Sequence, residues 1–269
     1  MKTPLLKALK CPKCRKDLFM TDGNSKQDEI DEGALACEKG HTWPIKEGIP
    51  SLVFPAITDE DAKWIAEYDE MAENYDELVK QYDDWLGIDM MEERKAFTHY
   101  ITMEGPLKIL DLSIGTAGNF MALHDVFDDQ MGRFNLHGLD LSWGMLRVAN
   151  RKIREKGFEV SLVRANVFRT PYADDFFDAV IHSGGVNTFS DIPGALREML
   201  RITKKGGFVM VVDEGLSPEV RKTERGKEII KANSLFEAKP PLEHIPEKAK
   251  DVELNYVMNG TFYSLVFRK

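Results

Sequence analysis

The sequence contains few cysteines, no long apolar run and no excess of positive charge. Its 269 residues include three cysteines, Cys11, Cys14 and Cys37, all near the N-terminus. An odd number of cysteines confined to one short segment argues against a disulfide framework and favours metal ligands. No apolar run approaches the roughly 20 residues that span a bilayer, and the N-terminus lacks a stretch long enough for a secretory signal. These absences predict a cytoplasmic protein without a membrane span.

Negative charge dominates and is unevenly distributed. The net charge is −9, and residues 59–93 hold fourteen Asp and Glu against Lys63 and Lys80. Such a segment repels phosphate backbones, because affinity for nucleic acid depends on cations that neutralise phosphates. A solvated helix face explains the same pattern more simply. With 43% hydrophobic residues, the chain can bury a substantial core.

The cysteines belong to a pattern with metal-ligand spacing. Cys11 and Cys14 form a C-x2-C pair, and Cys37 and His41 form a C-x3-H pair after a loop of 22 residues. Three thiolates and one imidazole complete a tetrahedron around Zn²⁺ and leave no open position, which is typical of a structural site. The alternative is three free thiols and an unrelated surface histidine.

Turn residues and helical periodicity divide the chain. Residues 1–55 read as short strands and turns, and Thr58 with Asp61 marks the start of a helix that runs to about residue 82. A second helix is expected to about residue 103. We therefore predict a zinc-ribbon module over 1–55 and a larger domain over 56–269, whose parts are the N-terminal helices (56–103), a cofactor-binding core (107–213), a substrate cap (217–250) and a terminal hairpin (251–269).

The core alternates between strands and helices. Strands are predicted at 108–112, 135–139, 159–164, 177–183 and 207–213, with helices near 118–127, 143–156 and 192–203. Short apolar strands separated by helices indicate a parallel sheet covered on both faces. Near the C-terminus, Asn259-Gly260 between two apolar segments predicts an antiparallel hairpin. The predicted fold class is α/β, a Rossmann-like doubly wound sheet that ends in this hairpin, with a small zinc ribbon at its N-terminus.

The end of the first core strand carries a small-residue loop. The sequence Ile109–Gly118 reads ILDLSIGTAG and resembles the methyltransferase motif [VI]-L-D-[VL]-G-x-G-x-G. Ser113 and Ala117 replace two of the glycines, and Gly115 keeps the position where backbone approaches ligand closely. Taken alone, the motif also fits a degraded dinucleotide fingerprint.

Later motifs distinguish these two possibilities. Asp140 ends the second strand, where a carboxylate can accept both ribose hydroxyls of adenosine. The segment from Asn166 to Val180 resembles the methyltransferase pattern G-D-A-x-x-L-P-F-x-D-x-x-F-D-x-V, with Asn166 in place of the aspartate that contacts adenine. The combined motifs resemble class I S-adenosylmethionine-dependent methyltransferases. The resemblance implies a set of cofactor-binding residues: Tyr75, Asp111, Ser113, Gly115, Ala117, Asp140, Leu141, Met145, Asn166, Val167 and Ser183.

Two further resemblances point to different methyl acceptors. The helix motif from Tyr68 to Asp76 is similar to (F/Y)-D-x-x-A-x-x-Y-D of quinone-biosynthesis and related small-molecule methyltransferases. The N-terminal CPKC…CEKGH segment resembles the zinc ribbon of ribosomal RNA guanine-N1 methyltransferases, and cations cluster there between Lys2 and Lys16. We expect a small-molecule or lipid-like acceptor; the alternatives are an RNA base, with RNA held by the ribbon, and a degenerate scaffold that binds cofactor without catalysis.

The sequence does not identify a catalytic residue. His182 lies at the end of the fourth predicted strand and is a candidate general base because its ordinary pKa lies near neutrality, although a side chain there more often points into the sheet. Glu214 lies just past the fifth strand and reads more simply as a solvated loop acid.

Overall fold

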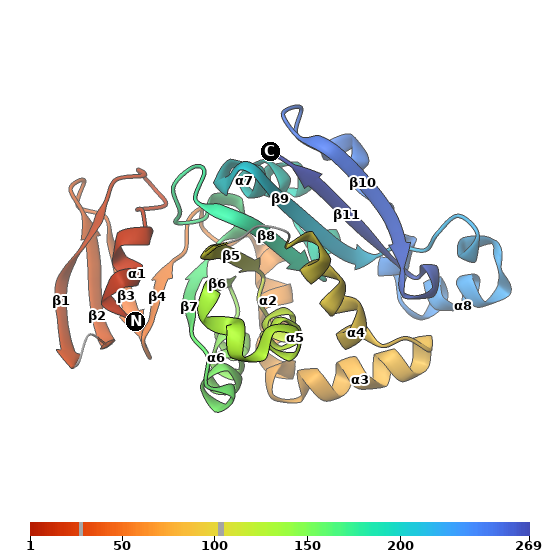
Figure 1. The fold of residues 1–269 in the computed structure, drawn as a ribbon, viewed down its shortest axis with the longest axis horizontal. Helices are drawn as coiled ribbons and strands as arrows, with labels where there is room; N and C mark the ends of the chain where they lie inside the picture. The colour runs from red at the N-terminus through yellow and green to blue at the C-terminus, as the bar shows by residue number, and fades with distance from the viewer. Residues whose placement is uncertain (27–28, 102–104) are drawn as a thin grey trace.

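In the described part of the chain, one sheet of eleven strands organises the fold (Figure 1). The computed structural model describes residues 1–26, 29–101 and 105–269. The strand order is β1-β2-β3-β4-β7-β6-β5-β8-β9-β11-β10. The strands are β1 (Leu18–Lys26), β2 (Glu29–Cys37), β3 (Thr42–Lys46), β4 (Ile49–Leu52), β5 (Leu107–Leu112), β6 (Phe134–Asp140), β7 (Val160–Ala165), β8 (Phe177–Ser183), β9 (Thr203–Glu214), β10 (Lys250–Val257) and β11 (Phe262–Arg268).

Helices lie on both faces of the central strands and beyond the carboxyl ends of these strands. The α-helices are α1 (Thr3–Ala8), α2 (Asp59–Met71), α3 (Tyr75–Leu86), α4 (Met90–Lys95), α5 (Gly118–Phe127), α6 (Trp143–Lys156), α7 (Ile192–Ile202) and α8 (Glu224–Ala232). The predicted cap of α2 is confirmed, since the Thr58 side chain accepts from the Asp61 N–H. The predicted second helix becomes α4 and a 3-10 segment over Ala96–Tyr100, and its expected end near residue 103 lies outside the described residues. No helix in the described part of the chain combines the length and apolar character needed to cross a membrane.

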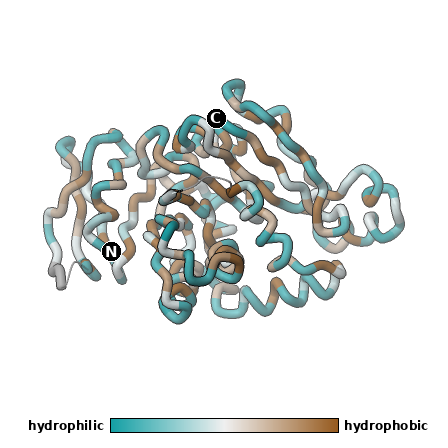
Figure 2. The backbone as a smooth tube through the Cα atoms, viewed as in Figure 1, coloured by the Kyte–Doolittle hydropathy of each residue, from teal (hydrophilic) through white to brown (hydrophobic). Residues whose placement is uncertain are grey.

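Alternate residues of the strands pack against different helices. On β5, Ile109 joins a buried cluster with Phe120 of α5 and Leu146 of α6, whereas Leu110 joins the cluster that contains Leu196 of α7. This follows from the two-residue period of a strand, which sends successive side chains to opposite faces. Apolar stretches along the central strands are visible in Figure 2. The predicted doubly wound parallel sheet is confirmed.

The C-terminal strands are antiparallel, as predicted. β11 pairs with β9 and with β10. The hairpin turns at Asn259-Gly260, where both residues have positive φ.

The N-terminal module is continuous with this sheet. β4 pairs in parallel with β7, with Ser51 opposite Arg164. The N–H of Lys10 donates to the carbonyl of Pro171 at 2.8 Å, and Leu9 joins the same buried cluster as Leu110. Residues 1–55 and the rest of the chain therefore share backbone hydrogen bonds and a hydrophobic core.

Glu198 of α7 links the two parts through buried polar contacts. Only 6% exposed, it accepts from Nε of Arg201 at 2.7 Å, from the N–H of Thr170 at 2.6 Å and from Arg15 of the N-terminal module at 3.4 Å. Arg15 also donates to the Thr170 carbonyl at 2.6 Å. Removal of this carboxylate leaves two guanidinium groups without their shared counter-charge.

We predict that Glu198→Ala lowers the free energy of unfolding by about 3–5 kcal/mol, because breaking a buried ion pair strands the remaining charge. Urea denaturation measures this change. The matched control is Asp174→Ala, which removes a 72% exposed partner of Arg201 and should cost less than about 1 kcal/mol. Equal, small effects of both variants would contradict the role assigned to Glu198.

Candidate functional site

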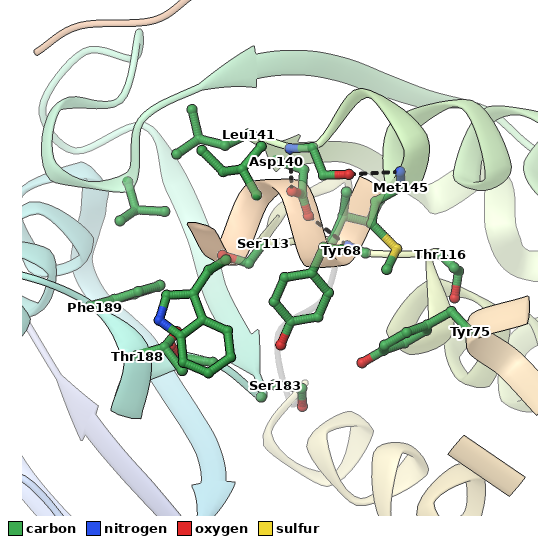
Figure 3. Close-up of a pocket in the computed structure, with 18 of the residues that line it drawn as sticks. Tyr68, Tyr75, Ser113, Thr116, Asp140, Leu141, Met145, Ser183, Thr188 and Phe189 are labelled. Atoms are coloured by element: carbon green, nitrogen blue, oxygen red, sulfur yellow. Dashed lines mark hydrogen bonds between the residues drawn. The ribbon is translucent and has the colours of Figure 1, made fainter. Parts of the chain in front are cut away.

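A cavity opens at the carboxyl ends of the parallel strands, where α/β proteins bind ligands. It encloses about 960 Å³ of empty space, including open solvent at its mouth. Of the eleven predicted cofactor residues, nine line it: Tyr75, Ser113, Gly115, Asp140, Leu141, Met145, Asn166, Val167 and Ser183. Figure 3 shows several of them around the space, with the phenol rings of Tyr68 and Tyr75 pointing into it.

Asp140 joins two loops at the floor of this cavity. One carboxylate oxygen accepts from the N–H of Gly115 at 2.9 Å, and the other accepts from the N–H of Ser142 at 2.9 Å. Each oxygen keeps a further lone pair for a ligand. Burial raises the pKa of Asp140, and hydrogen bonds from the backbone oppose that shift.

Carboxylates of the acidic helices fix those helices over the cavity. Asp69 of α2 accepts from the Ser142 hydroxyl at 2.5 Å and from the N–H of Gly144 at 2.7 Å. A Cβ at Gly144 would lie 2.9 Å from the Asp69 carbonyl oxygen, so this close approach requires glycine. Asp76 of α3 accepts from the Thr116 hydroxyl at 2.6 Å.

Asn166 has hydrogen-bond partners within the protein. Its side-chain oxygen accepts from the N–H of Phe168 at 3.0 Å, and its amide donates to the Pro55 carbonyl at 3.4 Å. The oxygen retains one lone pair, so it can still accept from an adenine amino group as predicted.

The remaining two predicted residues lie behind the cavity wall. Asp111 is fully buried on β5 and accepts from the Asn119 amide at 3.0 Å, and burial raises its pKa to about 8. Ala117 is also fully buried and has a left-handed φ of 67° at the start of α5. Neither lines the cavity: the Asp111 carboxylate is turned to Asn119 of α5, and Ala117 lies at the N-cap of the same helix. They shape the loop that carries Gly115.

A second cavity adjoins the first. Its empty space is about 1410 Å³, and the two cavities share Trp64, Tyr68, Tyr75, Arg94, Ser183 and Gly184 as lining residues. Its other walls are largely apolar and come from α2, α3, β9 and the C-terminal region: Glu67, Met71, Leu78, Val79, Gln81, Tyr82, Trp85, Met90, Val212, Glu214, Asn233, Leu235, Met258 and Phe262.

The segment predicted as a cap contributes to this second cavity. Asn233 donates to the Tyr82 hydroxyl at 2.8 Å, and the ring of Tyr82 stacks on Phe236 with centroids 6.0 Å apart. Asn233 and Leu235 line the cavity.

Arg94 is a site residue that the sequence analysis missed. It lines both cavities and lies so close to Gly118 that a Cβ there would be 1.5 Å from its Nη1. Its Nε is buried without a hydrogen-bond partner. The only sequence signal was a cation directly after an acidic segment. The sequence analysis also missed three residues that line the first cavity, Trp64, Thr188 and Phe189. Aromatic and hydroxyl residues at these positions have no distinctive spacing in the sequence.

The position of His182 does not suit a general base. Its side chain is 1% exposed and lines neither cavity. Nδ1 donates to the Leu112 carbonyl at 2.7 Å. Burial lowers the pKa of the imidazole, which favours the neutral ring, and the ring packs against Phe189.

The four predicted metal ligands come together at the edge of the N-terminal module. The ligand atoms of Cys11, Cys14, Cys37 and His41 all lie within 4.8 Å of one another. The Cys14 and Cys37 sulfurs are 3.5 Å apart, and Nδ1 of His41 lies 3.3 Å from the Cys37 sulfur. A tetrahedral zinc with bonds of about 2.3 Å to sulfur would fit between ligand atoms at these distances.

The chain is similar to known methyltransferases. Residues 58–225, more than half of the chain, match the model of the ubiE/COQ5 methyltransferase family. A demethylmenaquinone methyltransferase of Bacteroides fragilis is 33% identical over 132 residues, which cover 48% of this chain and 51% of that protein. A ubiquinone/menaquinone biosynthesis C-methyltransferase of Pectobacterium carotovorum is 36% identical over 39% of this chain and 42% of its own length. The chain thus spans about half the length of the curated relatives it matches.

Solved structures show the same fold. Phosphoethanolamine N-methyltransferase 2 of Haemonchus contortus, in complex with S-adenosyl-L-methionine, superposes with a TM-score of 0.53 at 16% identity, covering 66% of this chain and 52% of that one. The family match begins at residue 58, so it does not extend to the Cys/His cluster. The matched segment contains α2, α3 and the entire first cavity. The chain belongs to the ubiE/COQ5 methyltransferase family.

Proposed function

We propose that this protein transfers a methyl group from S-adenosylmethionine to a small, partly apolar acceptor. The observation that carries the proposal is the pair of adjoining cavities. One lies at the carboxyl ends of the sheet and the other is largely apolar, and they meet at Tyr68, Tyr75 and Ser183. A methyl donor in the first cavity and an acceptor in the second would face each other across that junction.

The lining of the first cavity suits each part of the donor. Asp140 would accept hydrogen bonds from the ribose hydroxyls, and Asn166 from the adenine amino group. The loop from Ser113 to Gly115 lets backbone approach the methionine portion. Arg94, with its partnerless Nε, would bind the methionine carboxylate through a charge-assisted hydrogen bond.

The chemistry requires the protein to position the two reactants and, for a hydroxylated acceptor, to accept a proton. The donor supplies an activated methyl group, and transfer is an in-line displacement in which the acceptor attacks the methyl carbon as the carbon–sulfur bond breaks. Holding the two reactants aligned in a water-poor junction removes much of the entropic barrier. The aromatic side chains of Tyr68 and Tyr75 at this junction would exclude water.

The second cavity fits a planar aromatic acceptor. Tyr82, Trp85 and Phe262 line it, and aromatic walls favour stacked or edge-on rings. The similar curated proteins are named for demethylmenaquinone and for ubiquinone/menaquinone biosynthesis. We therefore propose a ring-hydroxylated acceptor of the hydroquinone type.

RNA is a less favoured acceptor because most of the cations between Lys2 and Lys16 pair with carboxylates. Lys10 pairs with Asp17, Lys16 with Glu38 and Arg15 with Glu198. Cations already neutralised by carboxylates offer little to phosphates.

The same proposal includes one structural Zn²⁺ held by Cys11, Cys14, Cys37 and His41. Its support is the clustering of the four ligand atoms and the absence of a position for water in a set of four protein ligands. Since β4 of the module pairs with β7, the metal would stabilise one edge of the whole sheet.

The direct test is to supply S-adenosylmethionine carrying a tritiated methyl group, with protein and cell extract, and to sort the product into small-molecule, RNA and protein fractions. The proposal predicts label in the small-molecule fraction, dependent on the protein. Label in RNA would replace the proposed acceptor class, and no transfer to any fraction would refute the activity.

Asp140→Ala should weaken S-adenosylmethionine binding by about 2–4 kcal/mol, because a charged acceptor for two hydroxyls disappears. Calorimetric titration measures the change. Asp129→Ala, at an exposed position outside both cavities, is the control and should bind as the parent does. A loss below about 0.5 kcal/mol in Asp140→Ala would argue against the ribose contact.

Elemental analysis of untagged protein should find one zinc per chain. Cys37→Ser should lose the metal and lower the melting temperature of the whole protein, since metal binding and folding are coupled and the module shares the central core. His99→Ala, an exposed histidine outside the cluster, should retain both. Protein that is stable and free of zinc would contradict the assignment.

A further inference from the structure

The carboxyl group of Glu214 lies in the wall of the second cavity, beside that of Asp213. Glu214 ends β9, and its side chain lines the second cavity together with Val212, two residues before it on the same face of the strand. The other acid in that lining is Glu67, an exposed residue of α2. Among the described residues, Glu214 is thus the acid set into the wall of the cavity.

The preceding residue, Asp213, binds the backbone instead of lining the cavity. It is fully buried, and its carboxylate accepts from three backbone N–H groups: Asn187 at 2.8 Å, Glu214 at 2.9 Å and Gly185 at 3.3 Å. Asp213 therefore holds the loop after β8, which carries Gly184 at the junction of the cavities.

Desolvation and the Asp213 charge together raise the pKa of Glu214 well above its ordinary range. A base is most effective when its pKa lies near the working pH. The titratable and charged groups that line this cavity or interact with the Asp213–Glu214 pair are Glu67, Tyr68, Tyr75, Tyr82, Arg94, His182, Asp213 and Tyr263.

We propose that Glu214 is the general base that accepts the hydroxyl proton of the acceptor, an inference that rests on the proposed function. The acceptor O–H bond breaks and its proton moves to a Glu214 carboxylate oxygen. The electron pair left on oxygen, directly or through the adjacent ring carbon, forms the bond to the methyl carbon. The carbon–sulfur bond breaks and sulfur keeps its pair; if the ring carbon reacts, its hydrogen then leaves as a proton.

The test compares the parent protein with Glu214→Gln, using 1,4-dihydroxynaphthalene as the acceptor probe under anaerobic, reducing conditions. Glutamine keeps the shape and cannot take the proton. We expect kcat to fall about 100-fold or more, with S-adenosylmethionine binding unchanged by calorimetry. The parent rate should rise with pH as Glu214 ionises, and this limb should disappear in the variant. Glu219→Gln, the same change at an exposed position outside both cavities, should match the parent.

The remaining outcomes separate the role of Glu214 from the methyltransferase activity itself. Methylation by Glu214→Gln within threefold of the parent, with the same pH profile, overturns the role of Glu214 and leaves the proposed function intact. If the parent methylates no hydroxylated ring but labels another small molecule, the inference fails while the methyltransferase activity stands. If no fraction is labelled, both fail.

Discussion

The cofactor cavity depends on a single carboxylate that holds two loops together. Asp140 accepts from the N–H of Gly115 after β5 and from the N–H of Ser142 after β6. Neighbouring parallel strands bring these loops to one edge of the sheet, and Asp140 sets the distance between them. Each oxygen keeps a further lone pair and Asp140 lines the cavity, so one residue can both build the site and bind a ligand there.

The acidic helices are a second constraint, and they are not simply solvated. Asp69 and Asp76 bind the loops beneath them, and α6 supplies matching cations: Arg151 pairs with Glu73, and Lys152 with Asp76. Some carboxylates of α2 and α3 therefore hold these helices over the first cavity. This arrangement places Tyr68 and Tyr75 at the junction with the second cavity.

Local patterns predicted the elements well, because periodicity, capping and glycine placement act over a few residues. The helices α5 and α6 begin and end as predicted, and nine of the eleven predicted cofactor residues line one cavity. Contacts between distant segments could not be predicted in this way. The pairing of β4 with β7 joins Leu52 to Ala165, and the approach of Arg94 to Gly118 depends on how α4 packs. No local pattern specifies either. The predicted strands correctly included Asp111 and His182. A position near the end of a strand, however, does not determine whether its side chain reaches the cavity.

The proposed methyl transfer depends on which cofactor the first cavity binds. Calorimetric titration of the zinc-loaded protein with S-adenosylmethionine, S-adenosylhomocysteine and NAD tests this most directly. We predict one binding site per chain for the two sulfur-containing ligands and no measurable heat of binding from NAD. Binding of NAD more tightly than S-adenosylmethionine would contradict it, because the cavity would then serve hydride transfer rather than methyl transfer.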